Sequence, residues 1–128
     1  MLVLDVDRLK SLNDRYGHLA GADAVRAVGH ILAARLPSTA VACRYGGDEF
    51  VVALPGCDEV KARAIADDLR SAVHAAAPVL AGLPFPAATL SISVGLASRL
   101  ASGEALFRAA DAALYRAKES GRNHVWVA

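Results

Sequence analysis

Apolar and polar positions along the chain first predict a set of β-strands. The run from Leu2 to Val6 is apolar except for Asp5 and has the length of a short strand. Two β-rich runs on either side of Gly46-Gly47-Asp48-Glu49 predict a hairpin over Val41 to Leu54. From Thr89 to Ala97, large apolar residues alternate with serines, which is typical of a strand, and Val125 to Val127 is a last short one.

Apolar residues at helical spacing separate these strands. Leu9 and Leu12 begin a helical pattern that stops at Gly17 and Gly21. Asp23 is a suitable N-cap for the next helix, which is expected to end by Pro37.

The second half of the chain predicts two more helices. Asp58 is a plausible cap for the first of them, and Ser102 to Ser120 carries an apolar side that ends at Gly121. The segment from Ala76 to Ala87, rich in proline and alanine, is expected to be a loop. The predicted fold class is α+β, with a mostly antiparallel central sheet and helices packed around it. At 128 residues and without a linker, residues 1–128 are expected to form a single domain.

Composition and charge narrow the classes of function. A hydrophobic content of 55% with 21% charged residues excludes a disordered chain. A net charge of +1 argues against a large basic surface for nucleic acid and gives no sign of a polybasic membrane anchor. Mean hydropathy is +0.34, but three prolines interrupt the most apolar stretch, Ala72 to Leu90, so no membrane contact is expected. Cys43 and Cys57 are too few for a disulfide framework and are expected to be small buried or half-buried residues. Without a signal-like N-terminus, a cytoplasmic location is expected.

Two pairs of acids are the first candidates for chemistry. Asp5 and Asp7 are two residues apart and therefore share one face of an extended strand. Asp7 has an equally good interpretation as a helix cap, whereas a cap does not explain Asp5. Asp48 and Glu49 follow two glycines that can form a turn, because glycine adopts positive φ without strain. If the hairpin lies beside the first strand, Asp5, Asp48 and Glu49 can meet and bind Mg²⁺ for phosphoryl transfer; the alternative is a solvated turn.

Polar residues elsewhere could complete such a site. Lys118 and Arg122 are four residues apart at the end of the last helix and could contact phosphates, or only complement the helix dipole. Asn13 could contact a base edge or end its helix. His18, between two glycines, is more typical of a turn or packing residue than of a ligand.

Four stretches together resemble the GGDEF domain of the diguanylate cyclase family: LDVDRLKSLNDRYGHLAG, RYGGDEFVVALP, LSISVGLA and ADAALYRAKESGRN. They occur in the family order and nearly span the chain. The resemblance implies the palm-like nucleotide-cyclase fold and an enzyme that condenses two GTP into cyclic di-GMP with release of pyrophosphate. It also implies a homodimer, in which each protomer holds one GTP.

The resemblance assigns roles to individual residues. Mg²⁺ (or Mn²⁺) is expected on Asp5, the Val6 carbonyl and Asp48, and Asp48 also helps to deprotonate the 3′-hydroxyl. Glu49 is expected to support the metal or the turn. The remaining assignments concern the nucleotide. Asn13 is expected to contact guanine, and Gly46 and Gly47 to let the backbone approach the nucleotide closely. Lys118 and Arg122 are expected to hold the β- and γ-phosphates.

The sequence departs from the family pattern at three places. An acid that contacts guanine is usual where Ala22 stands; Asp23, one place later and about 100° further around a helix, is the remaining substrate-binding candidate for this contact. The R-x-x-D product-inhibition motif is absent from Pro37 to Ala40. The usual N-terminal helix is not in this chain, and an upstream sensor domain is expected in the full-length protein. These departures leave an alternative function, a catalytically weak or inactive domain for GTP binding or dimerisation.

Overall fold

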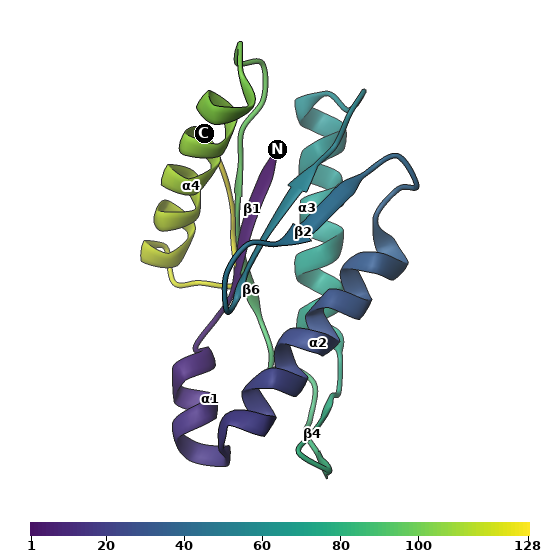
Figure 1. Ribbon diagram of the computed structural model, residues 1–128, viewed down its shortest axis with the longest axis vertical. Helices are drawn as coiled ribbons and strands as arrows, with labels where there is room; N and C mark the ends of the chain where they lie inside the picture. Colours follow the sequence, from purple (N-terminus) through teal and green to yellow (C-terminus); the bar gives the residue numbers. More distant parts are fainter.

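A five-stranded sheet with helices on both faces forms the centre of the protein. The computed structural model describes residues 1–128 (Figure 1). The strand order is β2 (Val41–Arg44), β3 (Glu49–Ala53), β1 (Leu2–Val6), β6 (Ile92–Leu96) and β7 (Val125–Val127). All neighbours are antiparallel except β6 and β7, which are parallel. The predicted α+β class and the mostly antiparallel sheet are confirmed.

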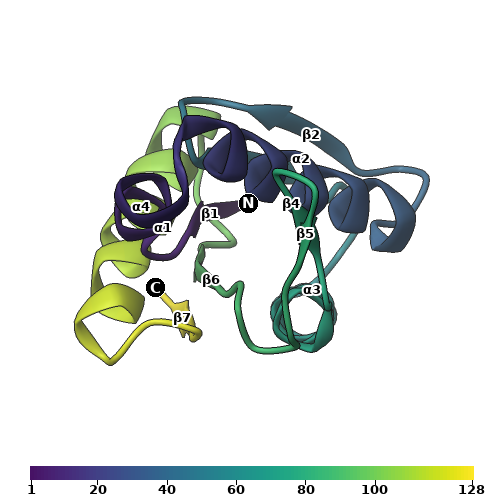
Figure 2. The ribbon, with the colours of Figure 1, turned by 90° about the horizontal axis from the view of Figure 1, so that it is seen from below.

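The alternation of side chains along β1 divides the core into two parts. Leu2, Leu4 and Val6 face the larger apolar cluster, which they share with α2 (His18–Arg35) and α3 (Glu59–Ala75). Val3 faces the other side, where it packs in a smaller cluster with Ala110 and Leu114 of α4 (Gly103–Glu119). Seen from below, α4 and α3 lie on opposite sides of β1 and β6 (Figure 2). Asp5 has the same parity as Val3 and therefore points toward α4.

Gly95 allows α4 to approach the sheet closely. A Cβ atom at this position of β6 would collide with the backbone of α4 at Ala110 and Leu114. Only a residue without a side chain leaves this space. The close contact fixes the height of α4 above β1 and thereby the position of the polar residues near its end.

Several predicted element ends are confirmed. Asp58 caps α3 by accepting a hydrogen bond from the Lys61 amide at 2.8 Å, and Ser102 caps α4 through the Ala105 amide at 3.1 Å. The hairpin lies beside β1, as expected, with Leu4 opposite Phe50. Gly121 follows α4 with φ of 108°.

Three predictions about local structure are wrong. Asp23 does not cap a helix, because α2 begins at His18, directly after α1 (Leu9–Tyr16) and Gly17. The expected loop from Ala76 to Ala87 contains a small hairpin, β4 (Val79–Leu80) and β5 (Leu83–Pro84), whose Leu80 is buried in the main core. Cys43 is exposed, because all of β2 lies at the open edge of the sheet; Cys57 is half-buried.

None of the helices is both long and apolar enough to cross a membrane.

Candidate functional site

Charged residues gather in a shallow hollow at one end of the sheet. Its volume is about 170 Å³, and its walls come from the end of β1, the β2–β3 turn and the C-terminal end of α4. The structure brings together five of the predicted site residues there, with four other residues at the start of α1. The lining residues are Asp5, Val6, Asp7, Arg8, Leu9, Lys10, Asp48, Lys118 and Arg122.

Asp5 is the most buried charged residue of this hollow, at 8% exposure. Its Oδ2 accepts a hydrogen bond from the Lys118 ammonium, whereas its Oδ1 is buried without any partner. Burial raises the pKa of Asp5 to about 6; Lys118 opposes the rise and the nearby Asp48 carboxylate adds to it. An unpaired buried carboxylate oxygen beside a second carboxylate is a donor set that suits a hard divalent cation.

The β2–β3 turn is held close to β1 by backbone contacts. The Val6 amide donates to the Asp48 carbonyl at 3.0 Å, which fixes Asp48 beside the end of β1. Arg44 closes the turn by donating to the carbonyls of Gly46, at 3.1 Å, and Gly47, at 2.6 Å.

The two turn glycines do not use positive φ, so the expected conformational reason for them is wrong. A Cβ atom on Gly47 would meet nothing within 4 Å, and one on Gly46 would only touch the Glu49 side chain at 3.8 Å. The space in front of the turn is therefore open, which is compatible with close approach of a ligand to this backbone.

Glu49 stands apart from the other two acids. It is the cross-strand neighbour of Asp5, but it does not line the hollow. Burial raises its pKa, with the carboxylates of Asp111 and Asp48 adding to the rise and Lys118 opposing it. No three acidic, histidine or cysteine side chains form a group that could hold a metal ion, so the expected cluster of three carboxylates is not formed. Asp7 also lines the hollow, but both of its oxygens already accept hydrogen bonds, which leaves Asp5 and Asp48, with the Val6 backbone, as the oxygen donors for a metal ion.

Asn13 lies outside the hollow, between α1 and α2. Its side chain packs against Gly21, where a Cβ atom would collide with it, and its Oδ1 is buried without a hydrogen-bond partner. A buried amide oxygen without a partner is costly unless it serves a purpose. This place is compatible with the expected contact to a base, away from the phosphate-binding charges.

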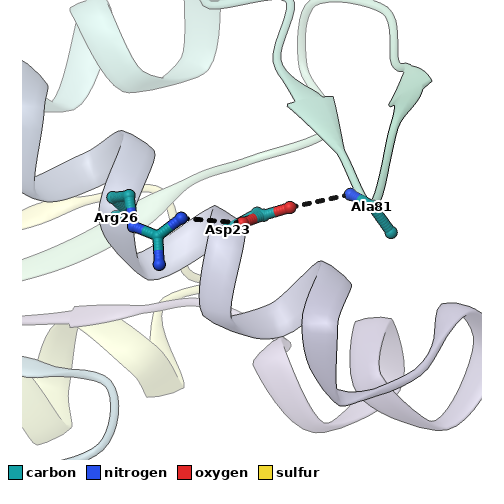
Figure 3. A network of polar contacts seen from close by, with 3 residues as sticks. All are labelled: Asp23, Arg26 and Ala81. Carbon is teal, nitrogen blue, oxygen red and sulfur yellow. Dashed lines mark hydrogen bonds and ion pairs between the residues drawn. The ribbon is translucent and has the colours of Figure 1, made fainter.

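Asp23 does not line the hollow. Its carboxylate accepts a hydrogen bond from the Ala81 amide at 2.9 Å and pairs with Arg26 at 3.2 Å (Figure 3). Asp23 therefore connects α2 to the β4–β5 hairpin. Ala22 lines a different hollow, of about 310 Å³, between α2 and the β2–β3 hairpin.

Sequence reasoning missed the partners of Asp7. The cap of α1 is Arg8, with φ of 55° and no side-chain hydrogen bond, so the interpretation of Asp7 as a helix cap is wrong. Asp7 instead accepts hydrogen bonds from Ser91, Ser93 and the Asn123 amide. The only sequence signal was its position two residues after Asp5, because the three donors are far away in the chain.

Comparison with known proteins agrees with this arrangement. The family model described as "Diguanylate cyclase, GGDEF domain" matches residues 1–124. The chain is 38% identical to the diguanylate cyclase DgcP of Pseudomonas aeruginosa, covering 100% of this chain and 19% of that protein. It is 34% identical to diguanylate cyclase A of Treponema denticola, covering 98% of this chain and 34% of that one. The chain thus spans between about a fifth and about a third of the length of these relatives.

Solved structures show the same fold. The GGDEF domain of DgcB from Caulobacter crescentus, in complex with c-di-GMP, superposes with a TM-score of 0.91 at 30% identity, covering 98% of this chain and 75% of that one. The GGDEF domain of TpbB (YfiN) from Pseudomonas aeruginosa superposes with a TM-score of 0.89 at 32% identity, covering 99% of this chain and 74% of that one. Since the family model and the relatives both cover nearly all of this sequence, the chain belongs to the GGDEF domain family of diguanylate cyclases.

Proposed function

We propose that residues 1–128 form one catalytic domain that condenses two GTP into cyclic di-GMP and releases two pyrophosphates. The observation that carries this proposal is the hollow itself, in which Asp5, with its unpartnered Oδ1, and Asp48 lie beside Lys118 and Arg122. Carboxylates for a metal next to cations for phosphates form the pair of subsites that a nucleoside triphosphate needs. The complex of a related GGDEF domain with c-di-GMP supports the choice of product.

Asp5, the Val6 carbonyl and Asp48 would hold Mg²⁺, or Mn²⁺ in its place. Bound there, the ion would neutralise part of the triphosphate charge and make the 3′-hydroxyl more acidic. Lys118, now paired with Asp5, is close enough to exchange this partner for a phosphate oxygen. Arg122 would contact the β- and γ-phosphates, and Asn13 would contact guanine.

The reaction consists of two equivalent transfers. The 3′-oxygen of each GTP attacks the α-phosphorus of the other, and the bond from that phosphorus to the bridging β-oxygen breaks. The 3′-proton passes to Asp48 and then to water, while Glu49 supports the turn that carries Asp48. Because each protomer holds one GTP, turnover requires a homodimer with its two hollows facing each other.

A second candidate is a domain that binds GTP or dimerises without turnover. Two observations favour it: Asp23 is already bound to Ala81 and Arg26, and the acids do not form a three-carboxylate group. Thermal shift with GTP and Mg²⁺ separates a nucleotide-binding domain from one that only dimerises.

Product analysis tests the catalytic proposal. Chromatography of the chain incubated with GTP and Mg²⁺ should yield cyclic di-GMP and pyrophosphate. Asp48→Ala should lower the rate by about 100-fold or more, because it removes both a metal ligand and the group that accepts the proton. Asp68→Ala, which removes a surface carboxylate paired with Arg35, is the control and should keep the wild-type rate. An Asp48→Ala protein with near wild-type product formation would contradict the metal site.

The wider setting is also a proposal. Relatives that are about three to five times longer leave room for the upstream sensor domain that the family resemblance implies, and we propose a cytoplasmic location for the domain.

A further inference from the structure

Asp7 lies at the centre of a hydrogen-bond network that the proposed reaction does not use. Its Oδ2 accepts hydrogen bonds from the Ser91 hydroxyl at 2.7 Å and from the backbone amide of Asn123 at 3.0 Å. Its Oδ1 accepts a hydrogen bond from the Ser93 hydroxyl at 2.7 Å. Both oxygens are therefore engaged, in contrast to Asp5. These contacts join the end of β1 to the β6 segment and to the turn that follows α4.

That turn has an unusual backbone. Arg122 has φ of 65° and Asn123 has φ of 45°, two consecutive left-handed residues directly after Gly121. Residues other than glycine adopt this conformation uncommonly, asparagine more readily than arginine, and surrounding contacts help to hold them in it. Two such contacts hold Asn123. Its backbone amide donates a hydrogen bond to Asp7, and its side-chain oxygen accepts one from Arg70 of α3 at 3.3 Å.

The direction of the Arg122 side chain follows from this turn. Its own amide donates to the Ala117 carbonyl at 3.2 Å, so the residue folds back over the last turn of α4. With this backbone, Arg122 lines the same hollow as Asp5 and Lys118. If the turn relaxed to right-handed or extended φ values, the Cα–Cβ bond of Arg122 would point elsewhere.

We propose that Asp7 is a positioning residue, which acts through Asn123 to hold the turn that carries Arg122 and thereby aims its guanidinium at the nucleotide phosphates. Arg70 supports the same turn through the side-chain oxygen of Asn123. The inference rests on the proposed function, since it requires Arg122 to contact phosphate. It assigns Asp7 a role other than binding a metal ion.

Asparagine at position 7 provides the conservative comparison. Its amide oxygen can accept from the Asn123 amide, while its NH₂ group can donate to the Ser93 hydroxyl, because a hydroxyl can reverse its role. Asp7→Asn therefore keeps the contact that holds the turn, and Asp7→Ala removes it. Asp58→Ala is the matched control, since it also deletes a carboxylate that accepts a backbone amide, at the start of α3.

The first experiment measures binding of inorganic tripolyphosphate with Mg²⁺ by calorimetry. Asp7→Ala and Arg122→Ala should each weaken binding by about 10-fold, the size expected for one charge-assisted contact. The double variant should bind no more weakly than Arg122→Ala alone, because the two residues act as one unit. Asp7→Asn and Asp58→Ala should bind within about 2-fold of the wild type. Additive losses in the double variant, or an equal loss in Asp58→Ala, would overturn the positioning role.

Amide hydrogen exchange separates this inference from the proposed function. In the chain without ligand, Asp7→Ala should make exchange of the Asn123 amide about 10-fold faster or more, and should leave the Lys61 amide unchanged. Unchanged exchange at Asn123 would contradict the inference whether or not phosphate binds. A wild-type chain that binds no tripolyphosphate would contradict the phosphate site, and with it the task of Arg122, even if the exchange result held.

Discussion

At the scale of single residues, position 22 bears most directly on the choice of substrate. Ala22 offers no hydrogen bond where the family pattern has an acid, and Asp23 is occupied by Ala81 and Arg26. Asn13, with its unpartnered Oδ1, is the polar group left for the base. We therefore expect GTP to be preferred over ATP by less than in relatives that carry the acid.

Restoring the acid tests this expectation. Ala22→Asp should increase the preference for GTP over ATP by about 1–3 kcal/mol, the value of one charged hydrogen bond to the guanine N–H groups, which adenine lacks. Nucleotide titrations of the wild type and the variant measure it. Asp23→Ala is the control and should leave the ratio unchanged. An equally strong GTP preference in the wild type and in Ala22→Asp would show that Ala22 does not relax selectivity.

Feedback by the product is a second residue-scale prediction. The segment from Pro37 to Ala40 has no guanidinium or carboxylate to bind a cyclic dinucleotide, so tight inhibitory binding of cyclic di-GMP there is not expected. Calorimetry with cyclic di-GMP checks this. Stoichiometric, tight binding that is lost when residues 37–40 are replaced would contradict it.

At the scale of helices and strands, prediction from sequence succeeded where local chemistry sets the element. The predicted cap at Asp58 binds an amide only three residues ahead, so the sequence alone shows both partners, and Ser102, where the last helix was expected to begin, caps it in the same way. It failed where the partner is distant. Asp23 has the features of a cap, but its carboxylate accepts a hydrogen bond from the backbone amide of Ala81, 58 residues away. The helix α2 already begins at His18, before Asp23.

The contact of Asp23 with Ala81 has a measurable effect on stability. Asp23→Ala should lower the free energy of unfolding by about 1–2 kcal/mol, because it leaves the part-buried Ala81 amide without a partner. Urea unfolding provides the measurement. Asp68→Ala, at an exposed ion pair, should change the free energy of unfolding by less than about 1 kcal/mol. Equal effects of the two substitutions would mean that Asp23 contributes no more than a surface charge.

Two glycines on different elements are expected to separate folding from function. Gly95→Ala should destabilise the protein by about 2 kcal/mol or more, since the added methyl group collides with the backbone of α4. Gly47→Ala should change stability by less than about 0.5 kcal/mol, because the space around it is empty and its φ is not positive. If a nucleotide approaches this turn closely, Gly47→Ala should still lower product formation. Thermal unfolding and product analysis of both variants test the contrast.

At the scale of the whole molecule, the sheet order explains how much of the site could be foreseen. Once the hairpin lies beside β1 and α4 lies over it, Asp5, Asp48 and Lys118 meet by necessity, and each was a candidate from its place in the sequence. The exact distances were not accessible. Lys118 binds Asp5 directly and Glu49 lies near Asp111, so only Asp5 and Asp48 of the three expected acids line the hollow.

The size of the hollow leads to a prediction about assembly. Clefts that enclose a small ligand measure roughly 300–1,000 Å³, whereas this one measures about 170 Å³ and is open at one side. On the proposed function, a hollow of this size would leave much of the bound GTP uncovered, and a second copy would supply the opposite wall. We expect the rate per protomer to fall in proportion to concentration once the protein is diluted below its dimer dissociation constant. Initial rates over a dilution series, with light scattering for the oligomeric state, measure this. A rate per protomer that stays constant while the protein becomes monomeric would show that a single chain completes the reaction.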